Sequence, residues 1–263
     1  MDQSYWHKQT IDQPLYPNIE WSKPEQRSQR GKLGIIGGNK LGFIGVAESY
    51  SVATKTGAGE VRVLLPDVLK KTMPSSMTDI IFGATNPSGS LARDALTEMK
   101  AIGEWSTGIL LIGDAGRNSE TAILYEDFIR DYHGPLTITR DAIDLVKNSS
   151  NILVERSETV LVLSFAQLQK LFSAVYYPKV LTFSMQLSNL IDNIHKFTIT
   201  YPVCIAVFHK DMVLVAKNGE VTSTPWAEPM QIWKGNTATN ASTYWLWNPS
   251  KTLESVTASL LNN

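Results

Sequence analysis

The chain has 263 residues, of which 43% are hydrophobic, and a formal net charge of −1 from 24 basic and 25 acidic residues. This length suits one large α/β domain or two small ones, and the apolar content is enough for a sizeable core. The balanced charge gives no bulk electrostatic attraction to nucleic acid or to an anionic membrane. A single cysteine, Cys204, excludes an intrachain disulfide, and its apolar surroundings predict a buried, inert thiol.

The first ten residues are polar, and no apolar stretch approaches the roughly 20 residues that a membrane helix needs. We therefore expect a cytoplasmic protein without a membrane partner. Residues 1–30 form a polar segment with three prolines, which we interpret as an arm. Five large apolar side chains are expected to hold this arm on the domain surface: Tyr5, Trp6, Leu15, Tyr16 and Trp21. No linker interrupts residues 31–263, so we expect one domain there.

The segment 31–66 predicts a βαβ unit. An apolar run at 32–36 ends in a double-glycine turn, the stretch 46–55 has helical character, and 61–65 is a second apolar run. Two parallel strands joined through a helix lie in one sheet. The turn at the carboxyl end of the first strand is where such sheets bind ligands.

Strand and helix patterns alternate along the rest of the chain. Strands are expected at 80–82, 108–113, 135–138, 152–154, 160–163, 203–208 and 212–216, with 180–182 as strand or loop. Helices are expected at 67–73, 91–102, 120–132, 141–146, 165–174, 186–195 and 253–261, the second of them capped by Ser90. This alternation predicts one doubly wound α/β domain, with 203–208 and 212–216 as a hairpin.

The opening segment resembles the ADP/ATP-dependent NAD(P)H-hydrate dehydratases, a branch of the ribokinase-like superfamily. The resemblance rests on the first strand, on Gly37-Gly38, on a helix of small residues and on Gly57-Ala58-Gly59 before the second strand. It extends over roughly Gly31 to Trp245. It implies a ribokinase-like three-layer α/β/α fold with a mostly parallel sheet, and a hydro-lyase that uses ADP or ATP, with Mg²⁺ as a possible companion, to dehydrate damaged NAD(P)H. Because that family assembles, it also suggests a homo-oligomer.

The same resemblance implies site residues. The substrate side would be lined by Gly37, Gly38, Asn39, Gly113 and Asp141, and the nucleotide side by Lys210, Gly235 and Asn236. Plainer interpretations stay open. The two glycine turns could be tight turns without a ligand, Asp141 could cap a helix, and Lys210 could be a solvated turn lysine. Four tryptophans could stack an adenine or pack over a sheet edge: Trp226, Trp233, Trp245 and Trp247.

The sequence departs from the family where the family carries its acid and base groups. The family's glycine-rich "GGTGD" turn, which begins a helix, aligns with 238–244 and puts Tyr244 at the catalytic aspartate. A tyrosine, with a reference pKa of about 10, is a poor base at pH 7. Ser164 and Gln167 stand at the family's histidine and glutamate, and Thr139 at another aspartate. The catalytic residue is therefore unknown.

Two hypotheses follow. The chain is either a divergent but active repair enzyme with another base, or a non-catalytic relative that serves as a nucleotide-binding or assembly module. A kinase of the same superfamily would need the same missing aspartate. The four histidines show no metal-ligand spacing, so no protein-borne metal site is expected.

Overall fold

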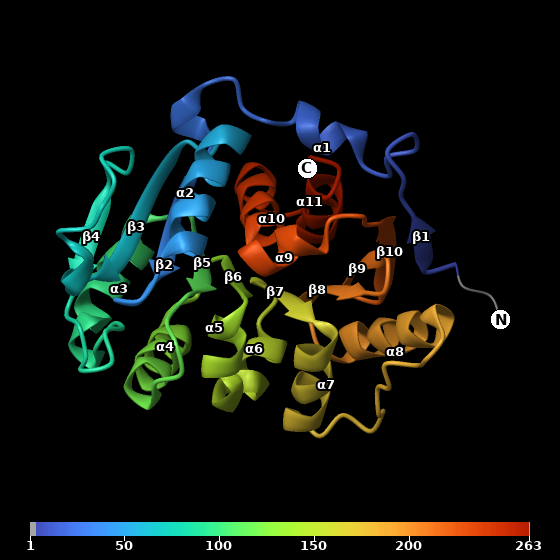
Figure 1. Cartoon of the computed structure of the whole chain (residues 1–263). Coiled ribbons are helices and arrows are strands. Elements are labelled where there is room, and N and C mark those ends of the chain that lie inside the picture. The colour runs from blue at the N-terminus through green and yellow to red at the C-terminus, as the bar shows by residue number, and fades with distance from the viewer. Residues whose placement is uncertain (1–3, 263) are drawn as a thin grey trace.

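A computed structural model describes residues 4–262. Its strands form one sheet in the order β1-β10-β9-β8-β7-β6-β5-β2-β3-β4, with helices on both faces (Figure 1). The strands are β1 (Trp6–Lys8), β2 (Lys32–Gly37), β3 (Glu60–Pro66), β4 (Ile80–Gly83), β5 (Gly108–Gly113), β6 (Leu136–Thr139), β7 (Thr159–Ser164), β8 (Cys204–His209), β9 (Met212–Lys217) and β10 (Glu220–Pro225). The helices are α1 (Pro17–Trp21), α2 (Ile44–Thr56), α3 (Leu96–Trp105), α4 (Ser119–Asp131), α5 (Asp141–Leu145), α6 (Ser150–Glu155), α7 (Phe165–Ala174), α8 (Leu187–Thr200), α9 (Pro229–Lys234), α10 (Asn236–Trp247) and α11 (Thr252–Ser259).

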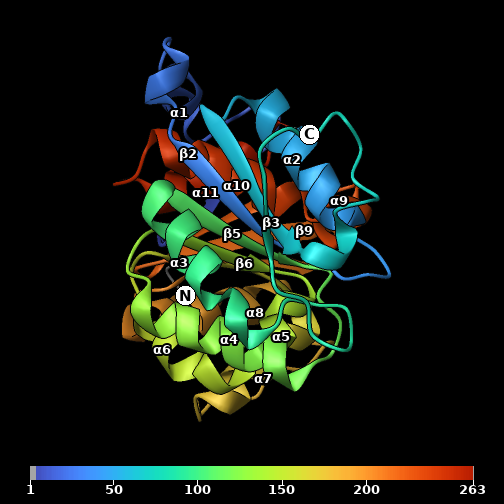
Figure 2. The same cartoon turned by 90° about the vertical axis from the view of Figure 1, so that its left-hand side faces the viewer.

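The sheet is buried between two helical layers. Helices α2, α10 and α11 cover one face, and α3, α4, α6, α7 and α8 cover the other, as the two perpendicular views show (Figures 1 and 2). On β5, Leu110 and Ile112 join the apolar cluster under α2 and α10, whereas Ile109 and Leu111 join the opposite cluster. Successive side chains of a strand point to opposite faces, so a fully apolar strand suits a sheet covered on both sides. The predicted three-layer, doubly wound architecture is confirmed.

The chain reverses its direction across the sheet between β2 and β5. Strand β2 pairs in parallel with both β3 and β5. From β2 the chain adds β3 and β4 on one side and then returns to place β5 on the other. The carboxyl ends of β2 and β5 therefore flank the topological switch point, where open α/β sheets bind ligands. The predicted hairpin is also confirmed, because β8 and β9 pair antiparallel.

The double glycine after β2 allows a close approach of two strands. A β-carbon at Gly37 would lie 2.2 Å from the carbonyl oxygen of Gly113. The N–H of Gly38 donates to that same oxygen at 2.8 Å, with Gly38 at a φ of +92°. The left-handed backbone and the lack of space both favour glycine here. The turn is thus first a packing requirement between β2 and β5.

The predicted strand at 152–154 is wrong, because these residues lie in helix α6. A short apolar run fits a buried strand or one face of a helix equally well. Strand β7 already pairs with β6 on one edge and with β8 on the other, so the sheet has no free edge for another strand there. In α6, Leu153 and Val154 are buried while Ile152 is partly exposed.

Other expected elements are shorter or shifted. Helix α3 begins at Leu96, after a 3-10 turn, and Ser90 does not cap it. The Ser90 hydroxyl instead donates to the carbonyl of Ala115 and accepts from the amide of Asn39. The helix expected at 67–73 is only a 3-10 turn at Asp67–Leu69, and 180–182 is loop.

The arm contributes a strand to the sheet. Strand β1 pairs in parallel with β10, and the indole N–H of Trp6 donates to the Ser223 hydroxyl at 2.8 Å. Ile19 is buried beside Tyr244 and Trp247, whereas Trp21 is 87% exposed, so Trp21 was wrongly expected as an anchor. The division into an arm over 1–30 and one domain over 31–263 stays a prediction, and residues 1–3 and 263 lie outside the described residues. Within 4–262, none of the helices combines the length and apolar character needed to cross a bilayer.

We expect Gly37→Ala to lower the free energy of unfolding by about 3 kcal/mol, because the new methyl group would force β2 away from the Gly113 carbonyl. Chemical denaturation followed by circular dichroism measures this change. Gly42→Ala is the matched control, since a β-carbon at Gly42 meets no atom within 4 Å. Equal stability of the two variants would contradict the assigned role of Gly37.

Candidate functional site

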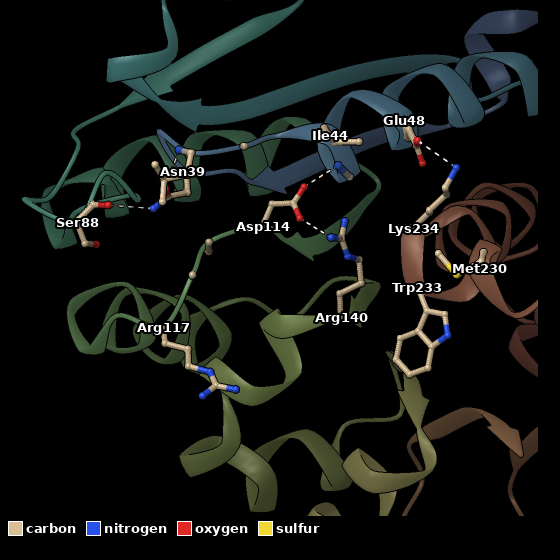
Figure 3. A pocket seen from close by; sticks show the side chains of 15 residues that line it. Asn39, Ile44, Glu48, Ser88, Asp114, Arg117, Arg140, Met230, Trp233 and Lys234 are labelled. Carbon is tan, nitrogen blue, oxygen red and sulfur yellow. Dashed lines mark hydrogen bonds and ion pairs between the residues drawn. The ribbon is translucent and has the colours of Figure 1, made fainter.

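A cavity of about 630 Å³ lies at the switch point, where β2 and β5 end (Figure 3). Its walls come from the loops after these strands, the first turns of α2, and α9 on the far side. The polar wall residues are Asn39, Glu48, Ser88, Asp114, Arg117, Arg140 and Lys234, and the large apolar ones are Leu41, Ile44, Met230 and Trp233. A second cavity of about 410 Å³ shares Asp114, Arg140 and Trp233 with the first and extends to Asp141, Asp144 and Gln167.

The centre of the site is an ion pair between Asp114 and Arg140. One carboxylate oxygen of Asp114 accepts the N–H of Gly45 at 2.6 Å, at the start of α2, and the other receives the Arg140 guanidinium (Figure 3). A helix N-terminus attracts negative charge, so Asp114 occupies an anion position. Both Asp114 and Arg140 have a φ of +56°, which is uncommon outside glycine and is found where the surrounding structure holds a residue in place.

The Arg140 guanidinium lies directly against Gly45. A β-carbon at Gly45 would be 1.6 Å from Nη1 of Arg140, so only glycine leaves room for this contact. Nη1 is buried and has no hydrogen-bond partner among residues 4–262. The site therefore keeps an unused donor beside the N-terminus of α2, which suits an anionic ligand.

Asp141 holds the loop after β5. Its carboxylate accepts the backbone N–H of Asp114 at 2.8 Å and that of Ala115 at 3.1 Å. Gly113, at a φ of +90°, lies so close that a β-carbon there would be 2.0 Å from Oδ1 of Asp141. The sequence left two roles open for Asp141, contact with a ligand or capping of the following helix, and this contact is neither of them. The carboxylate binds the preceding loop, and it also borders the second cavity.

The other substrate-side residues lie at the same edge of the sheet but differ in exposure to the cavity. Asn39 lines it, yet its amide donates to Ser90 and Ser88 while its oxygen accepts the N–H of Leu41. Gly37, Gly38 and Gly113 are not wall residues. The five predicted substrate-side residues therefore lie near one another at this edge of the sheet. The three glycines do not border the cavity; they allow the close backbone contacts behind it.

The start of α10 also reaches this centre. Gly235, at a φ of +95°, precedes the helix, and a β-carbon there would lie 2.3 Å from Ile112 and 3.5 Å from Cδ of Arg140. The turn predicted at 238–244 is wrong, because these residues lie inside α10. The residue at the helix start is Asn236, whose side-chain amide does not ionise near neutral pH and so cannot act as a general acid or base.

Tyr244 is far along α10 and buried against Trp247. Burial raises the pKa of Tyr244 to about 12, and the charge of Glu20 adds to this rise. The side chain is therefore a neutral phenol at pH 7. Its alignment with a catalytic aspartate at a helix N-terminus is corrected by its place inside the helix.

Of the three nucleotide-side residues, Gly235 and Asn236 adjoin at the start of α10, and Lys210 lies apart from them. Asn236 lines a separate cavity between the arm, α2 and α10. Lys210 lies in the turn between β8 and β9, where its ammonium is 3.5 Å from the carbonyl of Met185. It belongs to the walls of neither central cavity.

The carboxylates that border the two central cavities differ in how fully they are engaged. Asp114 pairs with Arg140 and Asp141 binds the loop. Glu48 is 3.7 Å from Lys234 through Oε1, whereas its buried Oε2 has no hydrogen-bond partner among the described residues. Asp144 accepts from Gln167 at 3.0 Å and from Lys170 at 2.7 Å. Behind them Tyr125 is fully buried, and burial, followed by the charges of Asp141 and Asp114, raises its pKa. The walls thus offer positive and aromatic groups, and Glu48 is the wall carboxylate that is least engaged.

From α9 the sequence singled out only Trp233, as one of four tryptophans that could stack an adenine, and neither Met230 nor Lys234. Trp233 and Met230 are 49% and 58% exposed at the cavity, beside Lys234 (Figure 3). Pro229 and Gly235 mark the two ends of a short helix in the sequence. The position of that helix over the cavity, however, depends on tertiary packing. Arg140 carried a clearer signal, because it directly follows a strand at the ligand-binding edge.

We expect Asp141→Ala to lower the free energy of unfolding by about 2 kcal/mol, because two backbone N–H groups lose their acceptor. Asp141→Asn keeps one acceptor oxygen and should lose less. Asp131→Ala is the matched control, since its exposed ion pair with Lys100 contributes little. Thermal and urea denaturation measure the series, and an Asp141→Ala variant as stable as Asp131→Ala would refute the loop-holding role.

Neither family models nor curated proteins match this chain. Solved structures do. A ribokinase-like superfamily protein from Enterococcus faecalis is 13% identical with a TM-score of 0.75, over 99% of this chain and 87% of that one. An ADP/ATP-dependent NAD(P)H-hydrate dehydratase from Bacillus subtilis, co-crystallised with ATP and Mg²⁺, is 9% identical with a TM-score of 0.61, over 92% and 83%. A phosphomethylpyrimidine kinase from Clostridium difficile is 10% identical with a TM-score of 0.55, over 88% and 98%. At these identities the likeness concerns the fold, and this chain has a ribokinase-like α/β/α fold.

Proposed function

We propose that this protein binds a nucleotide-like anion at the switch-point cavity and does not carry out the dehydration that the sequence resemblance implies. The ligand combines a phosphate group with a flat ring. The observation that carries the proposal is the wall chemistry: partnered carboxylates, a buried unused guanidinium donor at Arg140, and an exposed indole at Trp233.

The positive wall residues support the anionic part. Arg117 has no ion-pair partner among the described residues and faces the cavity with Arg140 and Lys234. Guanidinium groups bind phosphate through paired N–H donors. The half-exposed ring of Trp233, next to Met230, offers an apolar surface for a base. That a structural neighbour was crystallised with ATP and Mg²⁺ agrees with this ligand class.

The residues fit a nucleotide better than a protein-bound metal. The described residues include no group of three or more His, Cys, Asp or Glu side chains that could hold an ion. Mg²⁺ commonly binds through one or two carboxylates together with substrate phosphates. Glu48 or Asp114 could supply one such ligand, and the metal would then enter with the nucleotide and neutralise phosphate charge.

Catalysis by the dehydratase route needs a group that accepts or gives a proton beside the substrate. At the start of α10 the chain has Asn236, an amide, and it is the preceding Gly235 that lies near Arg140. The nearby carboxylates are held by arginine, lysine or backbone N–H groups. The alternative, an active hydro-lyase, is favoured by the dehydratase neighbour and would require Asp114 or Glu48 to leave its partner.

Titration calorimetry and thermal shift with ADP, ATP and NADPH test binding, and an assay on hydrated NADPH with ATP tests turnover. We expect binding of at least one nucleotide without turnover. Arg140→Ala and Trp233→Ala should each weaken that binding about tenfold, since each removes a direct contact.

Lys100→Ala is the matched control, because Lys100 pairs with Asp131 on the surface away from the cavity walls. Absence of binding to all three nucleotides would refute the proposal. Turnover by the wild type that Asp114→Asn abolishes would establish the active enzyme instead.

A further inference from the structure

A separate cavity, the arm cavity, lies between the N-terminal arm, α2 and α10, on the face of the sheet that α2, α10 and α11 cover (Figure 1). Its volume is about 510 Å³, within the range of small-molecule sites. It shares no wall residue with the two cavities at the switch point. A ligand of the arm cavity would therefore be independent of the nucleotide-like anion proposed above.

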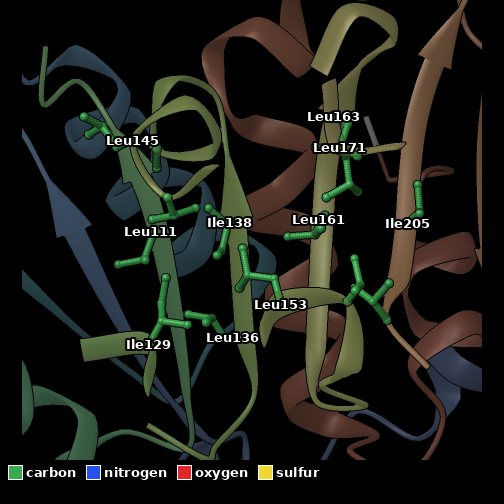
Figure 4. Packing of buried hydrophobic residues seen from close by; sticks show 14 of the residues in the cluster. Leu111, Ile129, Leu136, Ile138, Leu145, Leu153, Leu161, Leu163, Leu171 and Ile205 are labelled. Atoms are coloured by element: carbon green, nitrogen blue, oxygen red, sulfur yellow. The ribbon is translucent and has the colours of Figure 1, made fainter. Parts of the chain in front are cut away.

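The walls of the arm cavity are polar, unlike the packed interior. On the opposite face of the sheet, Leu111, Ile138 and Leu161 are at most 1% exposed and belong to one apolar cluster (Figure 4). The arm cavity has a single aliphatic wall residue, Val52. Its other walls are charged, amide, hydroxyl or aromatic side chains: Glu20, Lys23, Lys55, Thr56, Gln231, Asn236, Asn240, Tyr244, Trp247 and Asn262. A hydrocarbon would gain little here, because the walls offer it almost no apolar surface.

Several polar groups of these walls lack hydrogen-bond partners. The indole N–H of Trp247 and the side-chain oxygen of Asn236 are buried and unpaired among residues 4–262. The Tyr244 hydroxyl likewise forms no hydrogen bond within that range, although the residue is only 2% exposed. Thr56 and Asn240 beside them are paired with each other at 2.7 Å. Because buried polar groups are normally paired, the cavity keeps a free donor, a free acceptor and a hydroxyl that can do both.

Two lysines give the arm cavity a net positive charge. The Lys23 ammonium donates to the carbonyl of Thr56 at 2.7 Å and lies 4.8 Å from the centre of the Trp247 ring. Burial lowers the pKa of Lys23, and an anion beside it would oppose this effect. Lys55 is exposed at the rim and has no ion-pair partner in the part of the chain that the structure describes. Glu20, also exposed, is the one carboxylate among the wall residues.

These features together select a class of ligand. An inorganic anion would leave most of the 510 Å³ and the acceptor of Asn236 unused. A nucleotide base would need a free ring face, whereas the Tyr244 and Trp247 rings lie 4.7 Å apart and are at most 8% exposed. Hydroxyl groups can both donate and accept hydrogen bonds at the unpaired groups, and a phosphate matches two ammonium groups.

We propose that the arm cavity binds a small sugar phosphate. The phosphate lies at the two lysines, and the sugar hydroxyls bind the unpaired polar groups of α10.

Titration calorimetry of the full chain with ribose 5-phosphate, glucose 6-phosphate and fructose 6-phosphate tests this proposal. Glucose, gluconate and inorganic phosphate are the comparison compounds. We expect at least one of the sugar phosphates to bind with a Kd below about 1 mM. Each comparison compound should bind about tenfold more weakly, because it lacks the hydroxyls, the charge or the second negative charge of the phosphate.

Tyr244→Phe separates a ligand contact from a structural role. Because the hydroxyl has no partner in the protein, its removal should not lower the melting temperature, yet it should weaken sugar phosphate binding about fivefold. Lys55→Ala removes an exposed, unpaired cation and should have a similar effect on binding. Trp233→Ala is the matched control, because Trp233 does not line the arm cavity; it should lower nucleotide affinity and leave sugar phosphate binding unchanged.

Absence of binding by all three sugar phosphates, equal binding of gluconate or inorganic phosphate, or undiminished binding by either Tyr244→Phe or Lys55→Ala would overturn the proposal. Loss of sugar phosphate binding in Trp233→Ala would also overturn it, since the ligand would then lie at the switch point. Failure of ADP, ATP and NADPH to bind would refute the proposed function and leave this inference standing.

Discussion

The close approach of β2 and β5 is the constraint on which the site depends. The Gly113 carbonyl lies where a side chain of Gly37 would be, and it accepts the N–H of Gly38. This contact brings the loops after both strands together at the switch point. Asn39 then extends from one loop and Asp114 from the other, so the walls of the cavity follow from a backbone contact that only small residues permit.

The loops are held by polar side chains that form hydrogen bonds within the protein and so are not available to a ligand. Asp141 binds two N–H groups of the β5 loop, and Asn39 binds Ser90 and Ser88. Satisfied buried polar groups of this kind hold a loop in one conformation. A residue that aligns with a ligand-contacting residue of a family can thus stabilise a loop instead of contacting a ligand. Motif matching alone does not separate these two roles.

The fold could be predicted because its signals are local. Glycine turns and apolar runs mark β2, α2, β3 and β5, and each run is buried in the expected way. The strand expected at 152–154 could not be corrected from sequence, because the decisive fact is that β7 has partners on both edges. A similar limit applied to Tyr244. Its neighbours continue one helix without a break, and the helix start is marked only by Gly235, several residues upstream.

The ion pair of Asp114 and Arg140 also determines which groups an anion would meet at the switch point. Both oxygens of the Asp114 carboxylate are engaged, one by the N–H of Gly45 and the other by Arg140. The same pairing reduces the positive charge that Arg140 presents, which leaves its buried Nη1, together with Arg117 and Lys234, to attract an anion. The phosphate of the proposed ligand would therefore either share the Arg140 guanidinium with Asp114 or displace Asp114 from the start of α2. In both cases the ligand would reach a preformed anion position that the Asp114 carboxylate already occupies. Selectivity among anions would then depend on how well each anion replaces this single carboxylate.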